Sequence, residues 1–78
     1  PGGGEQRCVI EVKVVYAKDS WQTRRDEGLD QALDYGRTWA ADDLHVVIFD
    51  QRPGKTWDER YRDEVVEHQG RRIRVWGM

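Results

Sequence analysis

The sequence predicts a small α/β domain in which a β-α-β unit is followed by a C-terminal β-hairpin. Three observations support this fold class. Apolar residues alternate with period two over residues 8–16, an apolar stripe with 3–4 spacing runs through residues 25–40, and a second apolar run covers residues 44–49. A strand, a helix and a strand in this order are typical of a right-handed crossover between parallel strands. With 78 residues, the chain holds one domain at most, over residues 1–78.

The first predicted strand carries two opposite charges in its middle. Its even positions form one apolar face, which we expect to anchor the strand in the core: Cys8, Ile10, Val12, Val14 and Tyr16. Its odd positions include Glu11 and Lys13, which lie two residues apart and therefore share the other face. We expect these two side chains to face a cleft. A solvated ion pair is the alternative, and it would contribute only about 0–1 kcal/mol to stability.

The predicted helix follows a polar loop over residues 17–24. Thr23 and Asp26 together form an approximate capping box at its start. Gly28 and Gly36 weaken the helix, each by up to about 1 kcal/mol relative to alanine, so close packing must compensate. One side of the helix is apolar and should pack in the core: Leu29, Ala32, Leu33, Gly36, Trp39 and Ala40.

The second half of the chain should add a buried strand, a helical turn and a hairpin. The near-continuous apolar run at residues 44–49 indicates a strand covered on both faces. Residues 56–59 have the capping-box form, which favours a helical turn through about residue 62. Gln69 and Gly70 fit a two-residue turn that sets Val66 opposite Ile73 and Glu67 opposite Arg72.

Composition and charge limit the functional classes. The net charge is −2, so nucleic-acid contacts would need a local basic patch, for which Arg72 and Arg74 on one hairpin face are the candidates. A solvated face with ion pairs is the alternative for these arginines. The single cysteine, Cys8, excludes an internal disulfide and a cysteine metal cage, which favours a cytoplasmic location. No segment approaches the roughly 20 apolar residues of a membrane span.

Two histidines and the N-terminal residues carry no chemistry of their own. His45 lies on the buried strand and should be a core histidine with a satisfied ring, whereas His68 should lie at the surface beside the turn. Pro1-Gly2-Gly3-Gly4 is typical of a flexible end or the remnant of a cut.

The charged pair in the first strand suits phosphodiester chemistry. A carboxylate such as Glu11 can hold Mg²⁺ or Mn²⁺, which prefer oxygen ligands. Lys13, on the same face, can steer the attacking water or offset charge on the phosphate oxygens. On the helix, Gln31 and Tyr35 are four residues apart and therefore share one face, beside the apolar stripe.

These elements together resemble a known nuclease family. The order of "VIEVKV", "GLDQALDY", "LHVVIFDQRPGKTWDE" and "RRIRVWGM" resembles the C-terminal half of the PD-(D/E)xK nuclease superfamily, over residues 8–78. The Gln-x-x-x-Tyr element is similar to its RecB-like branch, and the wider text resembles the nuclease-like domain that follows ATPase modules in many bacterial and archaeal proteins. The resemblance implies a restriction-endonuclease-like fold, with Glu11 as a metal ligand and Lys13 as the residue that positions or activates water. It places Gln31 and Tyr35 near the metal and the nucleic acid.

The resemblance also implies that part of the family core is missing. That core is αβββαβ, and this chain begins at its third strand, so the first helix, two strands and the signature aspartate have no counterpart. We therefore expect hydrolysis to require a partner chain or a missing segment, and the uncovered first strand to favour a homo-oligomer. The alternatives are a non-catalytic oligomerisation or nucleic-acid-binding module derived from that fold, and a truncated product without activity.

Overall fold

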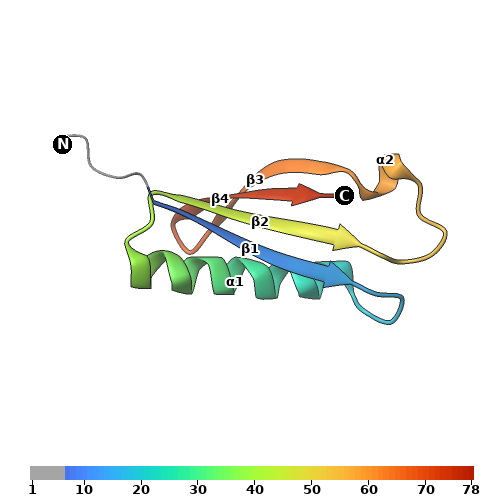
Figure 1. The fold of residues 1–78 in the computed structure, drawn as a ribbon, viewed down its shortest axis with the longest axis horizontal. Coiled ribbons are helices and arrows are strands. Elements are labelled where there is room, and N and C mark those ends of the chain that lie inside the picture. The colour runs from blue at the N-terminus through green and yellow to red at the C-terminus, as the bar shows by residue number, and fades with distance from the viewer. Residues whose placement is uncertain (1–6) are drawn as a thin grey trace.

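A computed structural model describes residues 7–78, in which four strands form one mixed sheet and a long helix lies against it (Figure 1). The predicted α/β class is confirmed. The expectation for Pro1-Gly2-Gly3-Gly4 lies outside the described residues. In chain order the elements are β1 (Cys8–Val15), α1 (Trp21–Trp39), β2 (Asp43–Asp50), α2 (Trp57–Arg60), β3 (Arg62–His68) and β4 (Arg71–Gly77).

The strands are ordered β1-β2-β4-β3 across the sheet. β1 is parallel to β2, as the β-α-β prediction requires, and β4 is also parallel to β2. β3 returns antiparallel beside β4. Within the described residues, β1 and β3 are therefore the two edges, and the last strand of the chain occupies an interior position.

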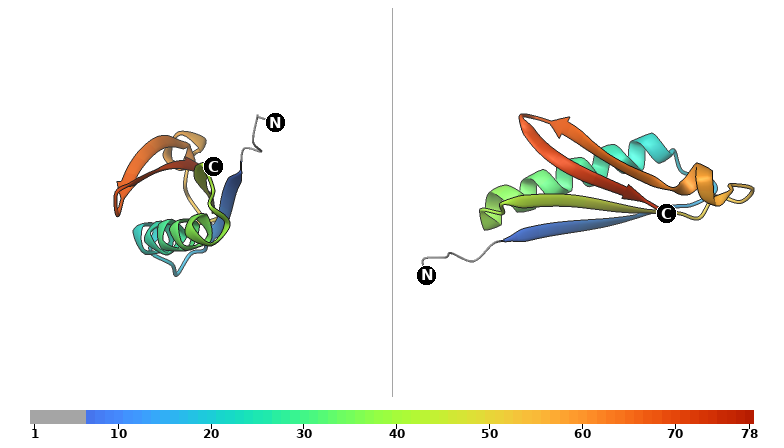
Figure 2. Two further views of the ribbon diagram at one scale, coloured as in Figure 1. Left: turned by 90° about the vertical axis from the view of Figure 1, so that its left-hand side faces the viewer. Right: turned by 90° about the horizontal axis from the view of Figure 1, so that it is seen from above.

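α1 lies on one side of the curved sheet (Figure 2). Its buried residues Leu29 and Leu33 pack with the buried side chains of β2 and β4: Leu44, Val46, Ile48, Ile73 and Val75. No described element covers the other side of the sheet. The expectation that residues 44–49 are covered on both faces is therefore wrong, since His45, Val47 and Phe49 alternate onto the open face and are only partly buried.

The glycines of α1 let the helix approach the sheet closely. A Cβ atom added at Gly28 would lie 2.8 Å from Val46 Cγ1, and one added at Gly36 would lie 2.5 Å from Leu44 Cδ2. The close packing that was predicted at both glycines is therefore observed. The helix begins four residues earlier than predicted, because the Ser20 side chain rather than Thr23 caps it and accepts a hydrogen bond from the backbone N–H of Thr23.

The end of α1 also differs from the prediction. Trp39 is its last residue and is exposed, so its assignment to the core is wrong. The left-handed conformation of Ala40, at φ 50°, closes the helix one residue before the buried Ala41.

The C-terminal hairpin follows the predicted register. Val66 lies opposite Ile73 and Glu67 opposite Arg72. Gln69 and Gly70 both have positive φ, at 50° and 83°, as a two-residue turn of type I′ requires. α2 ends at Arg60, two residues earlier than predicted, and its capping box between Thr56 and Glu59 is present.

Candidate functional site

Glu11 and Lys13 lie beneath α1. Their side chains are only 18% and 11% exposed, and Lys13 Nζ is 4.0 Å from Glu11 Oε1. A Cβ atom added at Gly28 would lie 3.2 Å from Lys13 Cγ, so the helix passes directly over the lysine stem. The absence of a side chain at Gly28 leaves room for the Lys13 stem between strand and helix.

The orientation of β1 overturns one prediction. Ile10 and Val12, expected in the core, are 61% and 51% exposed on the open face of the sheet. The parallel register sets Glu11 opposite Val46 and Lys13 opposite Ile48, both buried under the helix, so the odd positions face the core. Val15 is buried on this side and Val9 packs against the core, so the two ends of the odd face hold the strand in place. The charges therefore occupy the covered face, and apolar side chains occupy the uncovered one.

The two predicted helix residues are exposed on α1. Gln31 follows Gly28 by three residues, so it projects from the adjacent side of the helix, and Tyr35 lies one turn further on. Within residues 7–78 neither side chain makes a hydrogen bond to Glu11 or Lys13. The structure thus brings the strand pair together, whereas the helix pair makes no polar contact with it among the described residues.

The carboxylates of residues 7–78 do not by themselves form a set of magnesium ligands. Among the described residues, no group of three or more His, Cys, Asp or Glu side chains could hold a metal ion. Glu11 is the only carboxylate of the strand pair, whereas a hard divalent cation takes several oxygen ligands.

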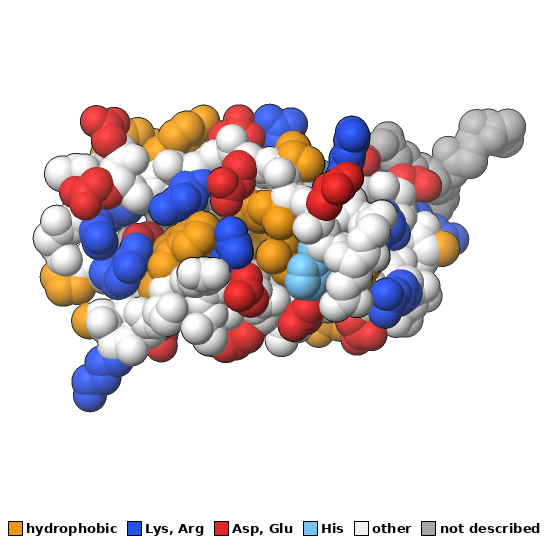
Figure 3. Space-filling view, turned by 180° about the vertical axis from the view of Figure 1, so that it is seen from behind, with side chains coloured by type: hydrophobic (Ala, Val, Ile, Leu, Met, Phe, Trp, Pro, Cys, Tyr) orange, Lys and Arg blue, Asp and Glu red, His pale blue; other side chains and the backbone are white. Residues whose placement is uncertain are grey.

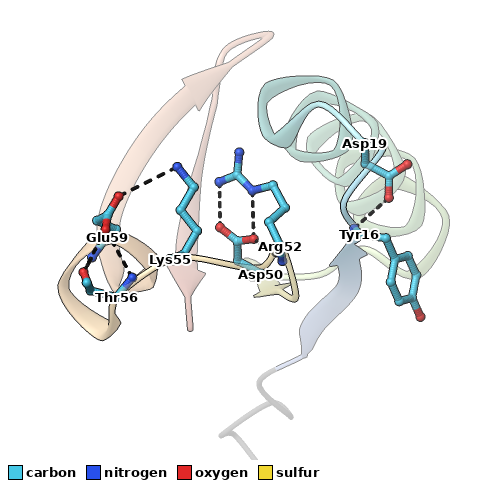
Figure 4. A network of polar contacts seen from close by, with 7 residues as sticks. All are labelled: Tyr16, Asp19, Asp50, Arg52, Lys55, Thr56 and Glu59. Atoms are coloured by element: carbon cyan, nitrogen blue, oxygen red, sulfur yellow. Dashed lines mark hydrogen bonds and ion pairs between the residues drawn. The ribbon is translucent and has the colours of Figure 1, made fainter.

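Asp50, at the end of β2, forms an ion pair with Arg52 (Figure 4). Its carboxylate is 1% exposed, accepts hydrogen bonds from Arg52 Nε at 2.9 Å and Nη2 at 2.6 Å, and also accepts one from the Arg52 backbone N–H at 3.0 Å. The side-chain hydrogen bond from Arg52 holds the pKa of the Asp50 carboxyl below its ordinary value, although burial opposes this shift. A carboxylate satisfied in this way stabilises the loop after β2 instead of binding a cation.

Two further polar contacts accompany the Asp50–Arg52 pair, and none of the three was predicted from the sequence (Figure 4). Asp19 accepts a hydrogen bond from the Tyr16 backbone at 2.8 Å, and Lys55 lies 3.8 Å from Glu59 (Figure 4). The signal available in the sequence was Asp50 directly after an apolar run, with Arg52 two residues later. Lys and Arg side chains gather at the end of the molecule that carries α2, interleaved with Asp and Glu (Figure 3). The positive and negative charges at this end therefore largely cancel.

The two arginines predicted to bind nucleic acid lie on the open face of the sheet. Arg74 donates three hydrogen bonds of 2.9–3.1 Å to the Asp63 carboxylate, and its guanidinium lies 4.4 Å from the centre of the Trp76 ring. Arg72 lies opposite Glu67 in the hairpin. Both arginines line a shallow hollow with Asp43, Leu44, His45 and Val65. For Arg74, an ion-paired surface position is therefore observed.

The histidines also have partners. Trp76 Nε1 donates a hydrogen bond to His45 Nδ1 at 3.2 Å, so the ring of His45 is satisfied as predicted, but on the open face instead of in the core. His68 Nε2 lies 2.7 Å from Asp30 Oδ1 and ties the hairpin to α1.

No protein-family model, curated protein or solved structure matches the chain. Within residues 7–78, no helix is both long enough and apolar enough to cross a membrane.

Proposed function

We propose that the chain is a metal-dependent nuclease-like domain whose Glu11 and Lys13 form part of a centre for phosphodiester hydrolysis. The observation that carries this proposal is the position of the pair beneath α1. Removing two charges from water costs several kcal/mol per ion, and a single contact of 4.0 Å recovers little of that cost. Apolar residues would serve stability better there, so a chemical role explains why the charges are kept.

The surrounding elements support the same proposal. Parallel β1 and β2 joined by α1 are what the C-terminal half of a restriction-endonuclease-like fold requires. Glu11 would act as a metal ligand, and Lys13 as the residue that positions water or stabilises charge on the phosphate. Gln31 and Tyr35, exposed on the helix that covers the pair, would position the nucleic acid.

The centre needs a further acidic group from outside the described residues. A partner chain or another segment would supply it, and Mg²⁺ or Mn²⁺ would then be held between that group and Glu11. Hydrolysis by the chain alone should accordingly be weak.

Cleavage assays with purified protein test the proposal. Labelled single-stranded and double-stranded DNA and RNA are incubated with Mg²⁺ or Mn²⁺, and we expect metal-dependent products that Glu11→Gln and Lys13→Met each eliminate. Glu67→Gln, which removes an exposed carboxylate of β3, is the matched control and should retain cleavage. Cleavage that persists in Glu11→Ala would refute the assignment.

A non-catalytic nucleic-acid-binding module is the second candidate, favoured by the hollow that Arg72 and Arg74 line on the open face. It predicts binding without cleavage under any metal. That binding should survive Glu11→Ala, weaken in Arg72→Ala and fall as salt releases the phosphate contacts.

A further inference from the structure

The free edge of β1 has backbone groups ready to pair with another strand. The carbonyl groups of Arg7 and Val15 accept hydrogen bonds from the backbone N–H groups of Asp42 and Gln51, at 2.8 and 2.7 Å, beside β2. Odd-numbered residues of β1 therefore direct their backbone groups toward β2. The even-numbered residues Ile10, Val12 and Val14 direct theirs to the free edge, where an added strand would bind.

An antiparallel partner strand can bind this edge only in certain registers. We call the boundary between β1 and the added strand the seam. In a hydrogen-bonded pair both residues direct their backbone groups into the seam, so an identical strand must set even positions opposite even positions. When the two-fold axis lies at Val12, that residue faces its own counterpart, Ile10 faces Val14 and Glu11 faces Lys13. When the axis lies at Glu11 or Lys13, like charges face one another. The sequence of β1 is thus self-complementary in one register alone.

We infer that β1 pairs antiparallel with β1 of a second copy about a two-fold axis at Val12, so that Glu11 of each copy lies opposite Lys13 of the other. The two sheets then become one continuous sheet. The dimer does not rest on the nuclease proposal, although both involve Glu11 and Lys13. It depends only on the free edge, the charges and the apolar positions of β1.

The charges fall where cross-strand contact is closest. In this register, Glu11 and Lys13 occupy non-hydrogen-bonded pairs, whose Cα atoms lie about 4.5 Å apart instead of about 5.5 Å. Within one copy the two side chains are separated by 4.0 Å and are 18% and 11% exposed, so each arrives already partly desolvated. Pairing across the seam gives each charge a second opposite neighbour.

The apolar residues of β1 gain contacts on the other face. Ile10 and Val12 are 61% and 51% exposed on the open side of the sheet. Across the seam they would meet Val14 and Val12 of the second copy, and β-branched pairs of this kind stabilise neighbouring strands. β3, the other edge among the described residues, carries three acidic residues, Asp63, Glu64 and Glu67, but only one arginine, Arg62. This excess of negative charge opposes self-pairing.

α1 leaves room for the second copy. Gly28 contacts both Lys13 and Val46, so the helix lies above the boundary between β1 and β2. Because strands lie about 4.8 Å apart, the two helices would run about 10 Å apart over the seam, which is a normal distance for packed helices. Arg24 Nε donates to the Val14 carbonyl oxygen at 3.3 Å, and that oxygen keeps a second lone pair for the Ile10 N–H of the second copy.

Charge exchange tests both the dimer and its register. We expect the wild-type protein to show a dimeric mass by light scattering at micromolar concentration, and Glu11→Lys and Lys13→Glu each to raise the dimer dissociation constant about tenfold or more. An equimolar mixture of these two variants restores opposite charges at every facing position, so it should form a heterodimer. The double variant E11K/K13E should dimerise like the wild type. A monomeric wild type, or single variants that dimerise unchanged, would overturn the inference.

Cysteine cross-linking tests the register with the native charges in place. In a Cys8→Ser background, Val12→Cys places two thiols opposite each other at the two-fold axis and should give a disulfide-linked dimer under mild oxidation. Ile10→Cys is the matched control on the same exposed face. Its own counterpart lies four positions along the second strand, about 13 Å away, so it should not cross-link. Equal cross-linking at both positions, or none at Val12→Cys, contradicts the register.

The two proposals can fail separately. A dimer whose nucleic-acid cleavage persists in Glu11→Ala leaves the pairing of β1 in place and removes the nuclease assignment. Cleavage that depends on Glu11 in a strictly monomeric protein keeps the nuclease assignment and removes the pairing of β1. E11K/K13E distinguishes them within one variant, because it should keep the dimer and lose cleavage.

Discussion

Gly36 of α1 packs against Leu44 of β2 so closely that a Cβ atom at residue 36 would lie 2.5 Å from Leu44 Cδ2. Leu44 is buried, so its side chain cannot move aside into solvent. The helix can therefore approach Leu44 this closely only because residue 36 carries no side chain. The same relationship holds at Gly28, above Val46 and Lys13.

Gly36→Ala should destabilise the domain despite the helix preference of alanine. Alanine favours the helix by about 1 kcal/mol over glycine, but overpacking costs about 1–3 kcal/mol, so we expect a net loss of about 1 kcal/mol. Urea unfolding followed by circular dichroism measures the difference. Asp34→Ala, at an exposed position of the same helix, is the control and should be neutral or slightly stabilising. A gain in stability at Gly36→Ala would contradict the close approach.

Arg52→Leu should destabilise the protein strongly at neutral pH. It leaves the buried Asp50 carboxylate without its partner, which costs about 3 kcal/mol for a pair of this kind. Lys55→Leu removes an exposed ion pair at the same end of the molecule and should cost less than about 0.5 kcal/mol. Equal effects of the two variants in urea unfolding at pH 7 would show that the Asp50–Arg52 pair has no special weight.

The contribution of that pair should depend on pH with a defined sign. The folded-state pKa of Asp50 is lowered, chiefly by the Arg52 side-chain hydrogen bond. Its stabilising effect is therefore fully present above the unfolded-state pKa of about 3.9 and is lost as the pH falls through the folded-state value. The difference in unfolding free energy between wild type and Arg52→Leu should therefore shrink as the pH falls from about 5 to about 2, a range that includes that pKa. A difference that stays constant over this range argues against the assignment.

Replacing the charged pair of β1 by apolar residues should stabilise the fold. Glu11→Leu combined with Lys13→Met removes two partly desolvated charges and should raise the free energy of unfolding by about 1–2 kcal/mol. Unfolding is measured at low protein concentration, so that association does not contribute. Cleavage should be lost in the same variant. A large loss of stability would instead show that the ion pair serves the fold.

The contact between Trp21 and Arg62 joins the start of α1 to β3 and should contribute to stability. The Arg62 guanidinium lies 4.2 Å from the centre of the Trp21 ring, whereas that of Arg25 lies 5.7 Å away. Arg62→Ala should lower stability by about 0.5–1 kcal/mol, which corresponds to a melting temperature lower by roughly 2–8 °C. Arg25→Ala is the comparison and should have the smaller effect. The reverse order would show that distance to the ring does not govern the contribution.

Features set by local chemistry were predictable from the sequence. The hairpin register followed from Gln69 and Gly70, because a two-residue turn fixes which residues face each other. The parallel β1–α1–β2 unit followed from the two apolar runs and the 3–4 spacing between them. The pairing of Glu11 with Lys13 on one face also followed from the period of a strand.

The face that β1 turns to the core was not predictable in this way. Counting apolar residues favoured the even positions, since Glu11 and Lys13 occupy the odd ones. The outcome depends instead on Val9 and Val15 at the ends of the odd face, and on Gly28, which leaves space above Lys13. These contacts join residues distant in sequence, so no local pattern reports them. Trp39 shows the same limit, because apolar spacing placed it in the core although it closes the exposed end of α1.

The position of β4 between β2 and β3 has a consequence for how the chain is made. Synthesis runs from the N-terminus, so β1, α1 and β2 emerge long before Arg71–Gly77, which fills the middle of the sheet. Until then the inner side of β2 lacks Ile73 and Val75, and β3 has no neighbour to pair with. Because a two-residue turn joins them, β3 and β4 can pair with each other first, and β4 then adds to the open edge of β2. This domain should therefore complete its sheet only after Arg71–Gly77 has emerged from the ribosome.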